Sequence, residues 1–194
     1  VDVMNDKLRI AYALTGSFCT FDKSLKQIEY LVKSGYDVLP VMSYNAFNTD
    51  TRFGKAVSFR KKIEELTGKK IISTIVDAEP IGPKNLADIF VVLPCTATTL
   101  SKLKNGIYDT PVTLAVKSHL RNQKPVVIGI STNDALSTTA KNIGELMNFK
   151  YFYFIPFKQD APDKKPFSIV CDFEQLEETV LSAQKGIQLQ PMIK

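Results

Sequence analysis

Small and hydroxyl-bearing side chains follow a short apolar segment in the middle of this 194-residue chain. The apolar segment covers residues 87–93 and ends at Pro94, and residues 100–106 have the pattern of a helix that stops at a glycine. Between them lie Cys95, Thr96, Ala97, Thr98 and Thr99. A strand that leads into a helix N-terminus presents unpaired backbone N–H groups, which suit an anion or the polarised carbonyl groups of a ring. The same residues also suit an ordinary N-cap, so this stretch alone leaves both interpretations open.

Three other short polar loops come directly after apolar segments of strand length. They contain Gly16 and Ser17 after residues 8–14, Ser43 after residues 36–42, and Ser131, Thr132 and Asn133 after residues 125–130. In a parallel sheet the carboxyl ends of the strands meet at one edge, where ligands bind. We therefore expect one neutral, hydroxyl-lined pocket that suits a phosphate attached to a flat heterocycle. No loop carries a G-x-G-x-x-G or P-loop sequence, so the shared position of the loops is the signal.

Strand-like and helical segments alternate along the chain. The expected strands cover residues 8–14, 36–42, 71–75, 87–93, 125–130 and 151–155. This alternation predicts an α/β fold in which a mainly parallel six-stranded sheet is covered by helices on both faces. We expect a single domain over residues 1–194, with its core from about residue 8 to residue 185.

Two expected helices and one loop complete this prediction. The helix over residues 53–66 is expected to bury Phe53, Ala56, Val57 and Ile63. A later helix is indicated by helical spacing of Leu136, Ala140, Ile143 and Met147. Residues 159–166 are polar and end at a proline, which predicts a loop.

Composition and charge exclude several classes of protein. The chain is 44% hydrophobic and 23% charged, which fits a globular domain, and no apolar run is long enough for a membrane span or a signal peptide. The net charge of +5 comes from lysines mixed with acidic residues, which indicates a solvated surface rather than a nucleic-acid site. Three widely spaced cysteines give neither a disulfide framework nor metal-ligand spacing. We expect a cytoplasmic protein without a metal, nucleic-acid or membrane partner.

Two residues with reactive side chains each have more than one interpretation. Cys95 precedes a helix N-terminus, which lowers the pKa of a thiol, but a small buried cysteine with no base nearby in sequence is the commoner arrangement. His119 is the only histidine, and on an expected helix over residues 113–121 it is interpreted as a surface or packing residue. No catalytic residue is identified.

The segment from Leu93 to Leu103, which reads Leu-Pro-Cys-Thr-Ala-Thr-Thr-Leu-Ser-Lys-Leu and continues to Asp109, resembles the signature of a flavoprotein family. That family includes flavin-containing cysteine decarboxylases, whose motif reads Pro-Ala-Ser-Ala-Asn-Thr, and flavin prenyltransferases, whose motif reads Pro-Cys-Ser-x-Lys-Thr. The resemblance extends from about Leu8 to Val180 and implies a three-layer α/β/α Rossmann-like fold.

The resemblance also implies a ligand, namely FMN or a phosphate or other anion in the same pocket. By family position, Gly16, Ser17 and Ser43 would hold the phosphate and ribityl chain of FMN, and Thr96 to Thr99 would edge the isoalloxazine ring. The full set of expected cofactor contacts is Gly16, Ser17, Ser43, Cys95, Thr96, Ala97, Thr98, Thr99, Ser131, Thr132 and Asn133.

Residues 14–20, 129–136 and 156–166 match a narrower branch of the family, which forms one subunit of a two-subunit oxidoreductase. This match implies oxidation of a small dihydro-dicarboxylate during bacterial sporulation, with NADP bound by a dehydrogenase-like partner subunit. It also implies a homo-oligomer in the cytoplasm of the mother cell. Lys158, Lys164 and Lys165 could face the dianionic substrate, or could belong to a solvated surface loop.

Departures from the family pattern bear on the alternatives. Ser131 stands where prenyltransferases carry an arginine, and Thr98 replaces the asparagine of the decarboxylases and the lysine of the prenyltransferases. Residues 77–85 lack the histidine that the decarboxylases use, and residues 131–137 replace their methionine-rich clamp. An independent FMN-dependent decarboxylase or prenyltransferase is therefore disfavoured, and a non-catalytic subunit that supports its partner remains a third interpretation.

Overall fold

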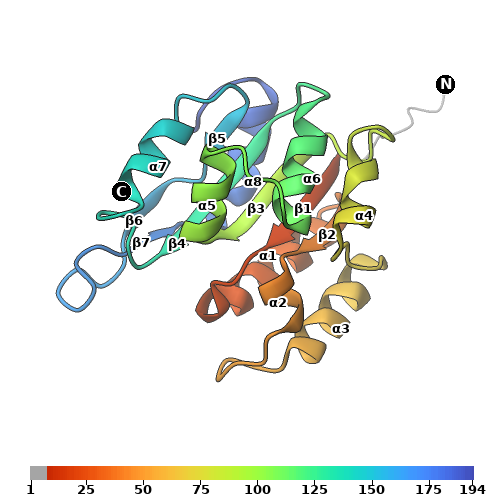
Figure 1. The fold of residues 1–194 in the computed structure, drawn as a ribbon, viewed down its shortest axis with the longest axis horizontal. Coiled ribbons are helices and arrows are strands. Elements are labelled where there is room, and N and C mark those ends of the chain that lie inside the picture. Colours follow the sequence, from red (N-terminus) through yellow and green to blue (C-terminus); the bar gives the residue numbers. More distant parts are fainter. Residues whose placement is uncertain (1–7) are drawn as a thin grey trace.

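The computed structural model describes residues 8–194, which form a sheet between two layers of helices (Figure 1). The strands are β1 (Arg9–Leu14), β2 (Asp37–Met42), β3 (Ile89–Cys95), β4 (Val126–Thr132), β5 (Phe152–Phe154), β6 (Phe157–Gln159) and β7 (Ile169–Cys171). Their order is β2-β1-β3-β4-β7-β6, and β5 pairs with β4. Strands β1 to β5 pair in parallel, whereas β7 runs antiparallel to both β4 and β6.

The helices cover both faces of the sheet, as the alternation predicts. They are α1 (Phe21–Lys33), α2 (Tyr44–Asn48), α3 (Ala56–Thr67), α4 (Ile75–Ala78), α5 (Ala97–Lys104), α6 (Pro111–Leu120), α7 (Ala140–Leu146) and α8 (Leu176–Gln184). In Figure 1, α5, α6 and α7 lie on the near face of the sheet and α1 and α8 on the far face. Single 3-10 turns precede α1 (Phe18–Thr20), follow α4 (Glu79–Ile81) and precede α8 (Phe173–Gln175). No helix in the described range of 8–194 is long and apolar enough to span a bilayer.

The expected strand over residues 71–75 is wrong. Only Ile72 pairs with β2, through a single parallel bridge to Val41. The chain then turns into α4, because the side chain of Thr74 accepts a hydrogen bond from the backbone N–H of Asp77 and so caps the helix. The sheet nevertheless has more than the six expected strands, because β6 and β7 form a hairpin on either side of the predicted loop. Each has only three residues, too few for a period of two to be visible.

Both expected helices are shorter than predicted. Helix α3 begins at Ala56, and Phe53 and Val57 are 44% and 55% exposed, whereas Phe59 packs against Phe21 at a centroid distance of 5.1 Å. Helix α7 begins at Ala140. Before it, the carboxylate of Asp134 accepts hydrogen bonds from the hydroxyl groups of Thr132 and Thr139, both at 2.7 Å, and holds residues 133–139 in turns. Leu136, which lies in these turns, is 46% exposed, and Met147, at the C-terminal end of α7, is 37% exposed, although both were expected on the buried face.

His119 is a packing residue inside the fold. Its side chain is fully buried beside the ring of Phe90, and its Nε2 lies 3.0 Å from the carbonyl oxygen of Pro125. Burial lowers the pKa of His119 to about 4, so its imidazole is neutral near pH 7. In this state Nε2–H donates the hydrogen bond, which confirms the packing interpretation and assigns the only histidine a structural role.

Asp88 holds the amino-terminal ends of the central strands together. Its carboxylate accepts hydrogen bonds from Arg9 Nη2 at 2.7 Å, Arg9 Nε at 3.0 Å and Lys124 Nζ at 2.9 Å. Burial by itself would raise the pKa of Asp88, but the hydrogen bonds from Arg9 and Lys124 outweigh it and hold the pKa well below its usual range.

We expect Asp88→Asn to destabilise the protein in a pH-dependent way. Because the pKa of Asp88 is lower in the folded protein, its stabilisation is complete above the unfolded pKa of about 4 and is lost as the pH falls toward the folded pKa. At pH 7 the variant should lose about 1–2 kcal/mol of stability, after allowance for solvent screening of a partly exposed network. Urea unfolding at pH 7, 5 and 3 should show the difference shrinking at pH 3, and a constant difference would contradict the argument.

Candidate functional site

The polar loops after the strands meet at one end of the sheet, as the sequence predicts. The hydroxyl of Thr15, after β1, donates to the carbonyl oxygen of Pro94 at 2.7 Å and accepts from the N–H of Thr96 at 3.0 Å. The hydroxyl groups of Ser17 and Ser131 lie 2.9 Å apart, which ties the loop after β1 to the end of β4. These hydrogen bonds join the loops after β1, β3 and β4 at one edge of the sheet, and two cavities open on it.

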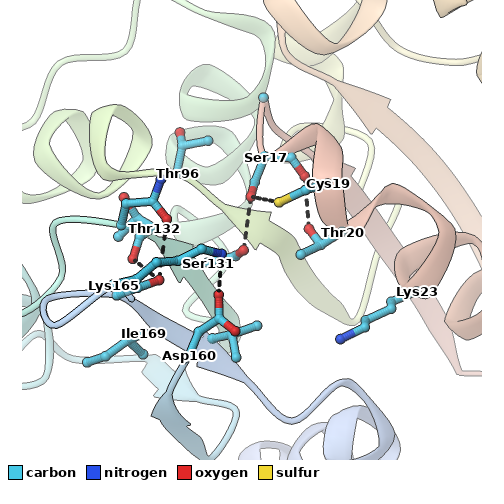
Figure 2. A pocket seen from close by; sticks show the side chains of 14 residues that line it. Ser17, Cys19, Thr20, Lys23, Thr96, Ser131, Thr132, Asp160, Lys165 and Ile169 are labelled. Carbon is cyan, nitrogen blue, oxygen red and sulfur yellow. Dashed lines mark hydrogen bonds and ion pairs between the residues drawn. The ribbon is translucent and has the colours of Figure 1, made fainter. Parts of the chain in front are cut away.

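The first cavity, called here the lysine cavity, has a volume of about 390 Å³ and is shown in Figure 2. It lies between the loop after β1, the start of α1, the end of β4 and the β6–β7 hairpin. Its lining residues are Gly16, Ser17, Cys19, Thr20, Lys23, Thr96, Ser131, Thr132, Asn133, Asp160, Lys165, Ser168, Ile169 and Val170. The volume is within the range of small-molecule sites, and the lining offers hydroxyl groups, an amide and two ammonium groups.

The two lysines of this cavity differ in their partners. Lys165 Nζ lies 2.9 Å from the carboxylate of Asp160, and this hydrogen bond raises the pKa of Lys165. Lys23, on the first turn of α1, has no carboxylate within ion-pair distance in the described part of the chain, and its Nζ lies 5.9 Å from the centroid of the Phe173 ring. The cavity therefore holds one paired and one unpaired positive charge, an arrangement that favours an anionic ligand.

The second cavity, called here the N-cap cavity, has a volume of about 350 Å³. It is lined by Thr15, Gly16, Phe18, Ser43, Tyr44, Asn45, Thr96, Thr98, Thr99, Lys102 and Thr110. Three of these residues are helix N-caps, since the side chains of Ser43, Thr96 and Thr110 accept from the backbone N–H groups that begin α2, α5 and α6.

The helix N-termini beside the N-cap cavity give it a positive electrostatic potential. A helix N-terminus carries a partial positive charge, and the N-cap residues of α5 and α6 both line this cavity. At the start of α5, the N–H groups of Ala97 and Thr98 have no acceptor among residues 8–194. Lys102 also lines the cavity, with its Nζ 2.7 Å from Asp109. Backbone N–H groups and hydroxyl groups around a positive centre are the donors that bind phosphate.

Comparison with known proteins places this arrangement in a family. The profile of the family described as Flavoprotein matches residues 1–180. The chain belongs to the flavoprotein family. The chain is 48% identical, over 95% of its length and 92% of the other, to the B subunit of dipicolinate synthase from Bacillus subtilis (strain 168).

Solved structures in the flavoprotein family show the same architecture. The crystal structure of the dipicolinate synthase B subunit from Bacillus halodurans C superimposes with a TM-score of 0.88 at 44% identity and covers 96% of each chain. The FMN-dependent cysteine decarboxylase SpaF shares the fold, with a TM-score of 0.68 at 22% identity over 92% of this chain and 97% of that one. The three-layer α/β/α Rossmann-like prediction is confirmed.

The structure divides the residues expected from the flavoprotein signature between the two cavities. Gly16 and Thr96 line both cavities and form their common border. The lysine cavity takes Ser17, Ser131, Thr132 and Asn133, and the N-cap cavity takes Ser43, Thr98 and Thr99. The loops therefore form two adjoining cavities rather than the single pocket that was expected.

Cys95 and Ala97, the two other expected contacts, line neither cavity. The side chain of Cys95 is fully buried at the end of β3, and burial raises the pKa of its thiol. The buried thiol is protonated near pH 7 and is not accessible to a ligand, so its side chain does not act as a nucleophile from that position. The buried packing role expected for Cys95 is confirmed, and its assignment as a cofactor contact stays a prediction that could concern only its backbone.

Sequence reasoning missed Lys23, Cys19, Asp160 and Lys102 as lining residues. Lys23 follows the Gly16-Ser17 loop by a few residues, so its place on the first turn of the next helix was a usable signal. Asp160 could not be placed without the β6–β7 hairpin. Of the three lysines expected to face a dianion, only Lys165 lines the lysine cavity; Lys164 lines neither cavity, and Lys158 lies in a separate groove.

We expect Cys19 to be the one readily alkylated cysteine of the folded protein. Cys19 is exposed in the lysine cavity, whereas Cys95 and Cys171 are buried and burial raises the pKa of both thiols. Iodoacetamide followed by mass spectrometry should give a single adduct on Cys19 and none on a Cys19→Ser variant. Adducts on Cys95 or Cys171 under native conditions would contradict the burial.

The donor set fits FMN. The N-cap cavity supplies helix N-termini and hydroxyl groups for a phosphate, and it meets the lysine cavity at Gly16, which has no side chain to separate them. A Cβ at position 16 would lie 3.6 Å from the ring of Phe18 and 3.7 Å from the Cβ of Asn45, two residues that line the N-cap cavity. No cluster of His, Cys, Asp and Glu side chains in the range 8–194 could hold a metal ion.

Proposed function

We propose that this chain is the B subunit of a dipicolinate synthase and binds the dihydrodipicolinate substrate in the lysine cavity. The observation that carries the proposal is the 48% identity to the B subunit of a dipicolinate synthase over nearly the whole of both chains. The cavity supports it, because a flat molecule with two carboxylates needs two positive partners and several hydroxyl donors. Lys23 and Lys165 supply the two positive charges, and Ser17 and Ser131 supply hydroxyl donors.

The residues of this chain bind and orient the substrate, and they carry no redox group. Oxidation of dihydrodipicolinate to dipicolinate removes a hydride, which passes to NADP, and releases one proton. The loop Thr15-Gly16-Ser17 lacks the second glycine that lets a backbone approach a dinucleotide pyrophosphate. NADP is therefore assigned to the dehydrogenase-like partner subunit, and this chain presents the substrate to it.

FMN fits the N-cap cavity of this chain as a second ligand. Gly16 and Ser43 would hold its phosphate and ribityl chain, and Thr98 and Thr99, together with the free N–H groups at the start of α5, would edge the isoalloxazine ring. Bound there, FMN would supply a two-electron acceptor. Thr96 and Gly16 would border the flavin on one side and the lysine cavity on the other. The absorbance spectrum and native mass of the purified protein test its presence directly.

Reconstitution tests the division of labour. Purified chain and purified cognate partner should together form NADPH from dihydrodipicolinate, and each alone should not. Turnover by this chain alone would refute the assignment of NADP to the partner, and full turnover by the partner alone would make this chain dispensable. Light scattering of the same samples measures whether this chain forms the expected homo-oligomer.

Dipicolinate should also protect Cys19 from alkylation. The thiol lines the cavity assigned to the substrate, so a bound dicarboxylate would cover it. In the absence of the partner, saturating dipicolinate should slow the alkylation of Cys19 several-fold, whereas benzoate, with one carboxylate, should protect it less. Equal rates of Cys19 alkylation with and without dipicolinate would contradict the assignment of the substrate to this cavity.

A further inference from the structure

A third cavity, called here the basic groove, adjoins the lysine cavity. It has a volume of about 370 Å³ and lies between α1, β7 and the turn that precedes α8. It is lined by Lys23, Lys26, Gln27, Lys158, Val170, Cys171, Asp172, Phe173 and Glu174. Lys23 and Val170 line the lysine cavity as well, so the two spaces share a wall.

The basic groove has unpaired positive charge. Lys26 and Lys158 make no ion pair within residues 8–194, and neither does the shared Lys23. Asp172 is ion-paired with Lys194, whose Nζ lies 2.7 Å from its carboxylate; the hydrogen bond from Lys194 lowers the pKa of Asp172, and the more distant charge of Lys158 lowers it further. Glu174 is the other carboxylate of the lining and is exposed. Three ammonium groups thus face one concave space with a single unpaired carboxylate against them.

We propose that the basic groove binds the phosphate groups of the nicotinamide dinucleotide that the partner subunit carries. The inference rests on the proposed function and goes beyond it, because it gives this chain a cofactor contact. Hydride transfer requires the nicotinamide within about 3–3.5 Å of the substrate carbon, so the ring must reach the lysine cavity. The diphosphate is joined to that ring through one ribose, and it must then lie in a neighbouring space.

The chemistry of the groove suits phosphate more than an acidic protein surface. Lysine ammonium groups are mobile point charges that bind phosphate without a fixed planar geometry. Here they come from α1 and β6, on two sides of a hollow, rather than from one flat face. An acidic side chain of the partner would have to enter this hollow, whereas a phosphate carries its charge on a compact group. The groove therefore extends the substrate site toward the cofactor.

Paired variants in the reconstituted complex test this assignment. Lys26→Glu combined with Lys158→Glu should raise the KM for NADP about tenfold, as expected for the loss of two exposed charge contacts, and leave the KM for dihydrodipicolinate within about twofold. Lys165→Glu, outside the groove, should raise the KM for dihydrodipicolinate and leave the KM for NADP nearly unchanged. Lys23→Glu should raise both KM values, because Lys23 lines both spaces. Lys141→Glu, an exposed lysine of α7 on the opposite face of the sheet, is the matched control and should change neither.

Two further measurements separate the possible failures. Sedimentation of the two subunits without cofactor should give the same affinity for the double variant and the wild type. A large loss of affinity there would show that the lysines meet an acidic protein surface and would overturn the proposal, as would an unchanged KM for NADP. If the wild-type complex does not turn over, the proposed function fails first. Calorimetric titration of this chain alone with inorganic pyrophosphate then tests the groove by itself. The wild type should bind pyrophosphate at one more site than the double variant does. The same titration curve for both proteins would overturn the proposal.

Discussion

Replacing Gly82 with alanine is expected to lower the free energy of unfolding by about 3 kcal/mol or more, at the upper end of overpacking effects. A Cβ at this position would stand 1.9 Å from the carbonyl oxygen and 2.7 Å from the carbonyl carbon of Ser118, which belong to the backbone of α6. Neither atom can rotate away. The backbone of Gly82 has φ −75° and ψ −60°, which any residue adopts, so the cost is entirely steric.

The hydrogen bonds around Gly82 explain why α6 cannot shift to make room. Its N–H donates to the hydroxyl of Ser118 at 2.7 Å, and its carbonyl oxygen accepts from Asn122 Nδ2 at 2.8 Å. Gly144→Ala is the matched control, because nothing lies within 4 Å of its Cβ position on α7. It should raise stability by about 0.5–1 kcal/mol through helix propensity. Urea unfolding of both variants measures the contrast, and equal effects of the two would contradict it.

Reversing the charge of Lys165 is expected to weaken dipicolinate binding about 30-fold, since it removes one charged contact to a carboxylate and adds a repulsive one. Asp160→Asn should act in the opposite direction. The carboxylate of Asp160 now occupies Lys165 at 2.9 Å and competes with the ligand, so its neutralisation should tighten binding about threefold, the size of an exposed ion pair.

Calorimetry with dipicolinate and the isolated chain measures both effects. Lys164→Glu is the control, because it makes the same charge change in the same loop at an exposed residue that lines neither the lysine cavity nor the N-cap cavity. A loss as large in Lys164→Glu as in Lys165→Glu would mean that long-range charge alone governs binding. Weaker binding by Asp160→Asn would mean that Asp160 holds the loop in place rather than competing with the ligand.

The sequence predicts the parallel centre of the fold and the edge of the sheet that carries the site. Continuous apolar strands such as residues 89–95 have a strong signal, because both of their faces are buried. Because β1 to β4 are parallel, the polar loops that follow them must lie at the same edge of the sheet. The same reasoning fails at residues 71–75. Only Ile72 pairs with β2, and the side chain of Thr74 caps α4, so the chain enters a helix there instead of continuing as a strand.

The remainder of the site depends on contacts between distant residues. Asp160 and Lys165 reach the lysine cavity only because β7 adds antiparallel to the end of β4, through pairs such as Ser131 with Val170. A three-residue strand leaves no periodic pattern by which its register could be read. Cys95 shows another limit, because its type and position suit a binding residue, whereas the burial of its side chain became visible only in the structure.

The shared walls between the three cavities have a thermodynamic consequence. Lys23 faces both the lysine cavity and the basic groove, and a single ammonium group cannot neutralise an anion in each at full strength. In the proposed complex, the two anions bound side by side would therefore weaken each other, and by linkage each would lower the affinity of the other by the same factor. A dianionic product next to a phosphate-bearing neighbour leaves more readily than it would alone. Antagonism of this kind favours turnover over tight retention of the product.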